Sequence, residues 1–133
     1  MRSLMILAAL LPQVALAQEV TPQSFETQWV AVEFEGQTSD AAYDSPATLV
    51  TSFSDIGGQT PCDTGWSGRV SFDWPKMKIE DVQSYYDDSC PAYKDTIAFL
   101  DALEKVDRVE AKPEGIELQS AQGERLILLN AGG

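Results

Sequence analysis

The chain has 133 residues, of which 44% are hydrophobic, and it carries 21 acidic residues against 9 basic ones. Because residues 1–17 contain one arginine and no acid, residues 18–133 have a net charge of −13. A surface this acidic repels phosphate backbones and anionic lipid headgroups, which argues against nucleic-acid binding and membrane adsorption.

The first residues have the pattern of a secretory signal peptide. A positive start is followed by an apolar run at 4–11 and by small residues that end at Ala17. The apolar run is shorter than the roughly 20 residues of a membrane-spanning helix, and Pro12 ends it. We expect cleavage of a signal peptide at 1–17, which leaves a single domain at 18–133 with no lipid and no membrane insertion.

The two cysteines, Cys62 and Cys90, are expected to form a disulfide, because exported proteins mature in oxidising compartments. The bond would join the loop before a strand at Trp66 to the start of a helix. On the chain-entropy model a loop of this length stabilises the fold by about 3 to 4 kcal/mol. The sequence therefore predicts that the helix is covalently fastened to the sheet.

Two strands are predicted in the first half of the chain, after a short leader at 18–23. Apolar residues alternate with polar ones at 29–34 and again at 47–53, which is typical of strands with one buried face. The residues expected on the buried faces are Val30, Val32 and Phe34 in the first strand, and Ala47, Leu49 and Phe53 in the second.

A turn is expected at 55–59, and further strands are predicted after it. Trp66, Val70 and Phe72 alternate with polar residues in a third strand, where Gly65 and Gly68 indicate a bulge or the close approach of another backbone. Met77 and Ile79 indicate a short fourth strand. The pattern at 82–86 fits either a fifth strand or a crossing to the helix.

One amphipathic helix is predicted at 91–106, with Ser89 as its cap and Pro91 in its first turn. An apolar stripe follows helical spacing along it, so the helix has to lie on a sheet. The stripe consists of Tyr93, Ile97, Leu100 and Leu103, with Phe99 and Val106 at its margins.

A three-strand antiparallel meander is predicted after the helix. Short runs at 108–110, 116–118 and 125–129 are separated by turns at 113–115 and 122–123. The last run is apolar throughout from residue 126, which is typical of a strand buried on both faces. The predicted fold class is therefore mainly β (α+β), a compact antiparallel sheet or barrel-like domain with one helix packed on it.

Several strings resemble the META domain, the HslJ-like family of heat-inducible bacterial envelope proteins. They are an Ala-Thr-Leu strand with a Gly-Gly turn, the two cysteines, the helix string at 99–106, and the strings at 115–118 and 123–126. The resemblance implies an acidic, secreted periplasmic protein linked to stress response or drug tolerance. It also implies that there are no established catalytic residues.

The residues themselves favour no enzymatic chemistry and no cofactor. There is no histidine, and disulfide-bonded cysteines are neither nucleophiles nor metal ligands. The carboxylates at 80–81 and 87–88 could attract calcium, but the spaced acidic loop with an internal glycine and a closing glutamate is missing. We therefore expect no catalytic residue and no metal site, and we interpret these acids as a solvated loop.

We expect the protein to act through its surface, as a non-catalytic accessory protein that contacts an unknown envelope protein and is itself a monomer. The alternatives are a small-molecule or peptide binder with a pocket at the mouth of the sheet, and an acidic inhibitor of a basic secreted hydrolase. The predicted contact surface consists of Trp74, Pro75, Asp81, Tyr85, Tyr86, Asp87 and Asp88.

Overall fold

The computed structural model describes residues 19–34, 37–38 and 46–131. The predicted signal peptide, with its cleavage after Ala17, lies outside the described residues. In chain order the elements are η1 (Pro22–Glu26), β1 (Trp29–Phe34), β2 (Gln37–Thr38), β3 (Ala47–Ser52), β4 (Asp55–Gln59), β5 (Gly65–Asp73), β6 (Lys76–Ser84), α2 (Tyr93–Lys105), β7 (Arg108–Lys112), β8 (Gly115–Gln119) and β9 (Arg125–Ala131).

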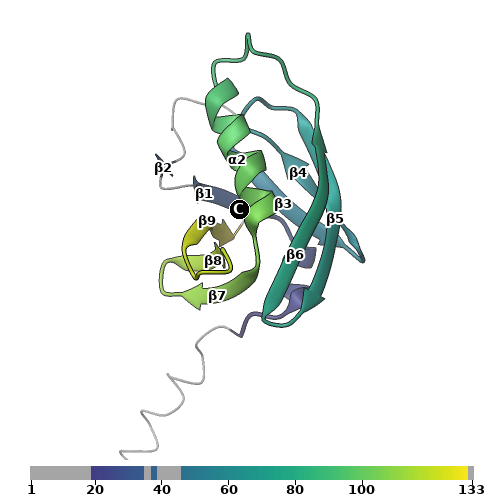
Figure 1. Cartoon of the computed structure of the whole chain (residues 1–133), viewed down its shortest axis with the longest axis vertical. Coiled ribbons are helices and arrows are strands. Elements are labelled where there is room, and N and C mark those ends of the chain that lie inside the picture. The colour runs from purple at the N-terminus through teal and green to yellow at the C-terminus, as the bar shows by residue number, and fades with distance from the viewer. Residues whose placement is uncertain (1–18, 35–36, 39–45, 132–133) are drawn as a thin grey trace, which may run out of the picture.

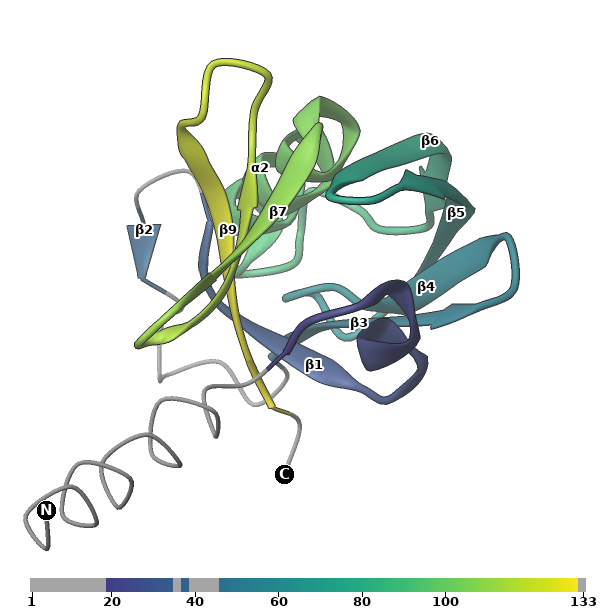
Figure 2. The ribbon, with the colours of Figure 1, turned by 90° about the horizontal axis from the view of Figure 1, so that it is seen from below.

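The strands form one antiparallel sheet that closes into a ring (Figure 1). Neighbouring strands follow the order β1-β3-β4-β5-β6-β7-β8-β9, and β1 pairs with β9 as well as with β3. The short β2 pairs with the end of β1. Figure 2 looks at the ring from below, with the strands arranged around it. The predicted fold class, mainly antiparallel β with one helix, is confirmed.

The core lies inside the ring, where α2 packs against β6, β9 and β1. Phe99 is fully buried, and its ring lies 5.6 Å from that of Phe34 and 5.8 Å from that of Trp66. The Trp66 indole N–H donates to the Thr48 carbonyl at 2.9 Å, so its polar atom is satisfied. Three strands and the helix therefore meet at one aromatic contact.

The helix differs from the prediction at its start and in its buried stripe. Its N-cap is Ala92, without a side-chain cap, and Pro91 precedes the first turn. Ser89 does not cap the helix, because it lies three residues before the N-cap and its hydroxyl donates to Asp87 Oδ1. The buried stripe is centred on Phe99, since small neighbours on that side let the helix approach the core closely. Its buried members are Thr96, Phe99, Ala102 and Leu103, whereas Tyr93, Ile97 and Leu100 are partly exposed.

The buried face of β1 was predicted correctly at Phe34 and wrongly at Val30 and Val32. Ala31 and Phe34 are buried, whereas Val30 and Val32 are half-buried. The register with β9 shifts between Ala31 and Glu33. Such a bulge places two residues of one strand opposite one residue of the other and changes which side chains face the core.

The prediction for residues 53–59 was also wrong. Phe53 is not on the buried face of β3: it lies in the turn after it, with φ of 58° and 94% of its side chain exposed. The expected turn at 55–59 is the strand β4. A Cβ at Gly58 would lie 2.0 Å from the Thr48 carbonyl oxygen, so this glycine marks a close approach of two strands and not a turn.

The remaining strand predictions are confirmed, except that the predicted fourth strand and the possible fifth strand are one strand. The third strand is β5, and the meander is β7, β8 and β9. Residues 76–84 form one continuous strand, β6, with a register shift against β5 near Asp81, whose φ is 56°. The predicted leader is partly structured, because η1 carries a fully buried Phe25.

The Cys62–Cys90 disulfide is present, with 5.9 Å between the Cα atoms. It joins the β4–β5 loop to the turn before α2. Thr60, fully buried in the same loop, accepts the Cys62 N–H on its hydroxyl at 3.2 Å. A disulfide of this kind is typical of proteins in an oxidising, exported environment. Within the described residues, no helix is both long and apolar enough to cross a membrane.

Candidate interaction surfaces

The predicted contact surface divides between the two ends of β6. Trp74 and Pro75 form the turn before this nine-residue strand, and residues 85–88 follow it. At about 3.3 Å per residue the two groups are roughly 30 Å apart. An interface of ordinary size with one partner would therefore be centred on one group or on the other.

At the first end, Trp74 belongs to an aromatic cluster that also contains Phe25, Trp29 and Phe72. Ring centroids lie 6.3 Å apart between Phe25 and Trp74, and 6.0 Å apart between Phe72 and Trp74. Phe25 is fully buried, while Trp74 is 36% exposed. Trp74 therefore covers the cluster with one face and presents the other to solvent.

At the second end, Tyr85 is 89% exposed, whereas Tyr86 packs on Tyr93 with ring centroids 5.7 Å apart. Asp87 accepts hydrogen bonds from the hydroxyl and the N–H of Ser89, which lower the pKa of its carboxyl. Asp88 is exposed. Tyr85, Asp87 and Asp88 are thus exposed in this loop, whereas Tyr86 is partly covered.

Asp81 lies in β6 and is part of neither group. Its carboxylate is 3.6 Å from Arg69 Nε in an exposed ion pair. Throughout the ranges that the structure describes, no three acidic or cysteine side chains gather in a way that could hold a metal ion.

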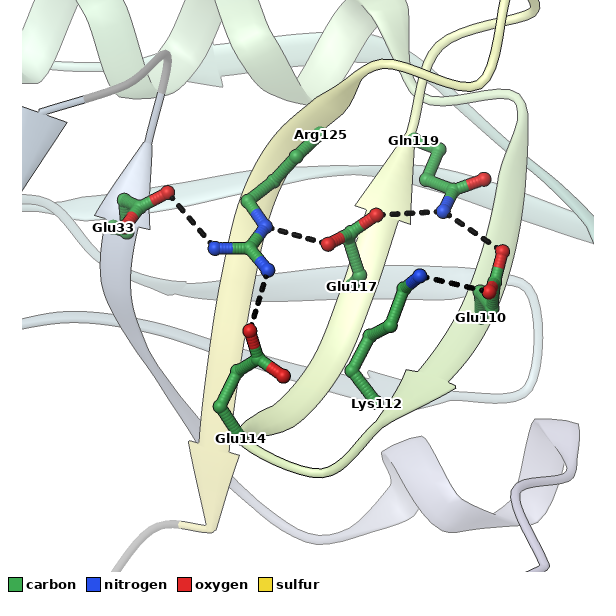
Figure 3. A network of polar contacts seen from close by, with 7 residues as sticks. All are labelled: Glu33, Glu110, Lys112, Glu114, Glu117, Gln119 and Arg125. Carbon is green, nitrogen blue, oxygen red and sulfur yellow. Dashed lines mark hydrogen bonds and ion pairs between the residues drawn. The ribbon is translucent and has the colours of Figure 1, made fainter.

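An ion network that the sequence analysis did not find covers the outer face of β1, β8 and β9 (Figure 3). The Arg125 guanidinium contacts Glu33 at 3.2 Å, Glu114 at 2.8 Å and Glu117 at 2.5 Å. These acids come from β1, the β7–β8 turn and β8. The three carboxylates raise the pKa of Arg125, and Arg125 lowers the pKa of Glu114. The network joins the two strands, β1 and β9, that close the ring.

The network continues to β7 through an amide. Gln119 donates to Glu117 at 2.6 Å and to Glu110 at 3.0 Å, and Lys112 Nζ lies 2.9 Å from Glu110. Lys112 and then Gln119 lower the pKa of Glu110. Glu110 and Glu117 are direct cross-strand neighbours, which would repel each other if unbridged. No short sequence pattern indicates this arrangement, because it depends on strand register.

A groove of about 640 Å³ lies at the end of the ring that carries the aromatic cluster, and it was also not located from the sequence. Its lining includes Val20, Trp29, Ala111, Lys112, Ile116 and Asn130. The Trp29 indole N–H donates to the Ser24 carbonyl at 2.7 Å, so this ring contributes an apolar wall.

Phe53 is an exposed aromatic side chain that the sequence analysis placed in the core. Its polar neighbours, Ser52, Ser54 and Asp55, are the signal that would have placed it in a turn. Its backbone adopts the left-handed conformation, which disfavours bulky residues.

Comparison with known proteins shows the fold alone. No family model matches the sequence, and no curated protein matches it. An NMR structure of a protein from Burkholderia xenovorans is similar over 86% of this chain and 94% of its own, with a TM-score of 0.62 and 19% identity. A second NMR structure is similar over 84% and 93%, with a TM-score of 0.55 and 14% identity. The chain thus shares its whole fold with two solved proteins whose descriptions name no activity.

Proposed function

We propose that this protein is a non-catalytic accessory protein of the bacterial periplasm that acts by contact with another envelope protein. The proposal includes membership of the META domain, HslJ-like family, on the sequence strings quoted above. That resemblance implies a part in stress or drug tolerance. The exported environment indicated by the disulfide supports the location.

The observation that carries the proposal is the solvent exposure of Tyr85. Tyr85 is 89% exposed, yet the loop that follows it is fixed at two residues. Tyr86 packs on Tyr93, and Cys90 is bonded to Cys62. An aromatic side chain on a fastened loop loses little conformational entropy on binding, and tyrosine is frequent among residues that dominate binding energy.

The charge of this loop indicates the character of the partner. Asp87 and Asp88 follow Tyr85 closely in the chain, and the hydrogen bonds from Ser89 lower the pKa of Asp87. Acidic groups beside an aromatic anchor favour a partner surface with basic residues, through both steering and specificity.

The carboxylates elsewhere support a non-catalytic role. Glu110 and Glu114 have pKa values lowered by their contacts with Lys112 and Arg125, and Asp87 is shifted in the same direction. A general acid that works near neutral pH needs a raised carboxyl pKa. These groups are instead held as ions in structural contacts.

The test is crosslinking in the intact envelope followed by mass spectrometry, for wild type, Tyr85→Ala and the control Gln83→Ala. Gln83 is exposed on β6 close to the loop, so its loss should leave the partner unchanged. We expect one specific partner to be crosslinked in wild type and control and to be lost in Tyr85→Ala. Turnover of a substrate by the purified protein, or a partner that is retained in all three, would contradict the proposal.

A further inference from the structure

The pairing of β6 with β7 stops at Pro75. The Lys76–Arg108 pair is flanked by two 3.0 Å bonds, from the Met77 N–H to the Asp107 carbonyl and from the Val109 N–H to the Pro75 carbonyl. In a regular antiparallel ladder, the residue opposite Val109 would return a bond from its own N–H to the Val109 carbonyl. Proline has no N–H, so the ladder ends there.

Strand β7 nevertheless continues to Lys112. Backbone N–H groups alternate in direction along a strand, so the N–H of Ala111 points the same way as that of Val109, away from β8. Among the described residues no backbone group pairs with Ala111 on that side. The N–H and the carbonyl of Ala111 are left open on this edge, whereas the Val109 carbonyl faces the ring of Pro75, which stands where a donor N–H would be.

The groove described above lies beside this edge. Ala111 lines the groove together with Trp29 and Ile116, and the inner side chain of β7 before it, Val109, is buried. Side chains of a strand point alternately to the two faces of the sheet. A strand added at Ala111 would therefore send every second side chain toward the apolar wall formed by Trp29 and Ile116.

The outer face next to the edge is acidic. It carries four glutamates against two cations: Glu33, Glu110, Glu114 and Glu117 with Lys112 and Arg125. Glu110 is the outward-facing residue of β7 next to Ala111. The outward side chains of an added strand would thus meet a carboxylate, which favours lysine or arginine there.

We propose that the β7 edge is a strand-addition site for an extended peptide segment, with apolar side chains in the groove alternating with basic ones on the outer face. Main-chain bonds to the open groups supply part of the affinity, and the groove and Glu110 supply selectivity. The site is distinct from Tyr85 and does not depend on the proposed function. The open groups belong to Ala111, and the edge ends shortly after it at Pro113.

The experiment is a titration of the ¹⁵N-labelled mature protein with a short synthetic peptide in which valine alternates with lysine. We expect the largest shifts at the amide of Ala111 and at the indole of Trp29. The same peptide with glutamate in place of lysine should bind at least about tenfold more weakly at low salt. The same peptide with methylated backbone amides should also lose at least about tenfold, because it cannot donate to the Ala111 carbonyl.

The matched variants are Ala111→Pro, which removes the open N–H, and Ala121→Pro in an exposed turn as control. Peptide binding should be lost in the first and retained in the second. If Ala111→Pro does not fold, the methylated peptide tests the same bonds on the wild-type protein. Equal binding of methylated and unmethylated peptide, or shifts centred away from Ala111, would overturn the proposal. So would concentration-dependent shifts of Ala111 without peptide, which would assign the edge to a second copy of the chain.

Discussion

The two ends of the strand ring are closed in different ways. At one end, the thirteen-residue helix α2 and the disulfide cover a core contact in which Phe34 and Phe99 are almost fully buried. At the other end, the five-residue η1 inserts Phe25, while Trp29 is partly exposed in the lining of the groove and Trp74 is partly exposed in the turn before β6. Burial, and with it stability, is concentrated at the α2 end, whereas open surface is concentrated at the η1 end.

The largest expected effect comes from removing the contact at the α2 end. Phe99→Ala should lower the free energy of unfolding by about 4 kcal/mol, because it leaves a cavity between the rings of Phe34 and Trp66. Leu100→Ala, on the partly exposed side of the same helix, should cost clearly less. Urea unfolding followed by tryptophan fluorescence measures both, and equal losses would show that the stripe is not centred on Phe99.

The disulfide should rank next. Replacing both Cys62 and Cys90 by serine releases a loop with a sequence separation of 28 residues. On the chain-entropy model this costs about 3 to 4 kcal/mol. Chemical denaturation of the double variant against the oxidised wild type gives the value. An unchanged midpoint would mean that packing alone holds the helix to the sheet.

Arg125→Ala tests the ion network on the outer face of β1, β8 and β9, between the two ends of the ring. This change leaves the buried Glu117 carboxylate with Gln119 as its remaining partner, and it should cost about 2 kcal/mol. Arg69→Ala is the matched control, since its ion pair with Asp81 is exposed and should contribute less than about 1 kcal/mol. Similar losses for both arginines in denaturant titrations would argue against a special role for the network.

The smallest effect is a gain at the η1 end. Phe53→Asn should raise stability by about 0.5 to 1 kcal/mol, because asparagine tolerates the left-handed backbone that Phe53 adopts at φ of 58°. Phe53→Ala has no side-chain amide to hydrogen-bond locally in this conformation and should not give this gain. Thermal unfolding of the two variants separates backbone strain from side-chain exposure. A loss of stability in both would show that the exposed ring packs in solution.

The elements that the sequence predicted correctly are those set by local pattern. The meander was found from its two turns, and the disulfide from the compartment implied by the first residues. The errors at Val30, Phe53 and Gly58 share one cause, since a bulge, a hairpin turn and a close approach are each fixed by the neighbouring strand. Tertiary context decides these features, and the residue pattern alone does not contain it.

The candidate site was predictable only in part for the same reason. Tyr85 and Trp74 were placed between elements and are exposed, as expected of a contact surface, but the split between them follows from the continuity of β6. The part played by Pro75 could not be predicted, because it depends on Val109 lying opposite, 34 positions along the chain.

The most direct test of the contrast between the two ends is native-state hydrogen exchange of two adjacent amides in β7. The backbone N–H of Glu110 points toward its partner strand β8, whereas the backbone N–H of Ala111 points toward the open edge. We predict that the Glu110 amide is strongly protected while the Ala111 amide exchanges almost as fast as in an unstructured peptide. Equal protection of both amides would contradict the account, because it would mean that the edge beside the groove is already paired.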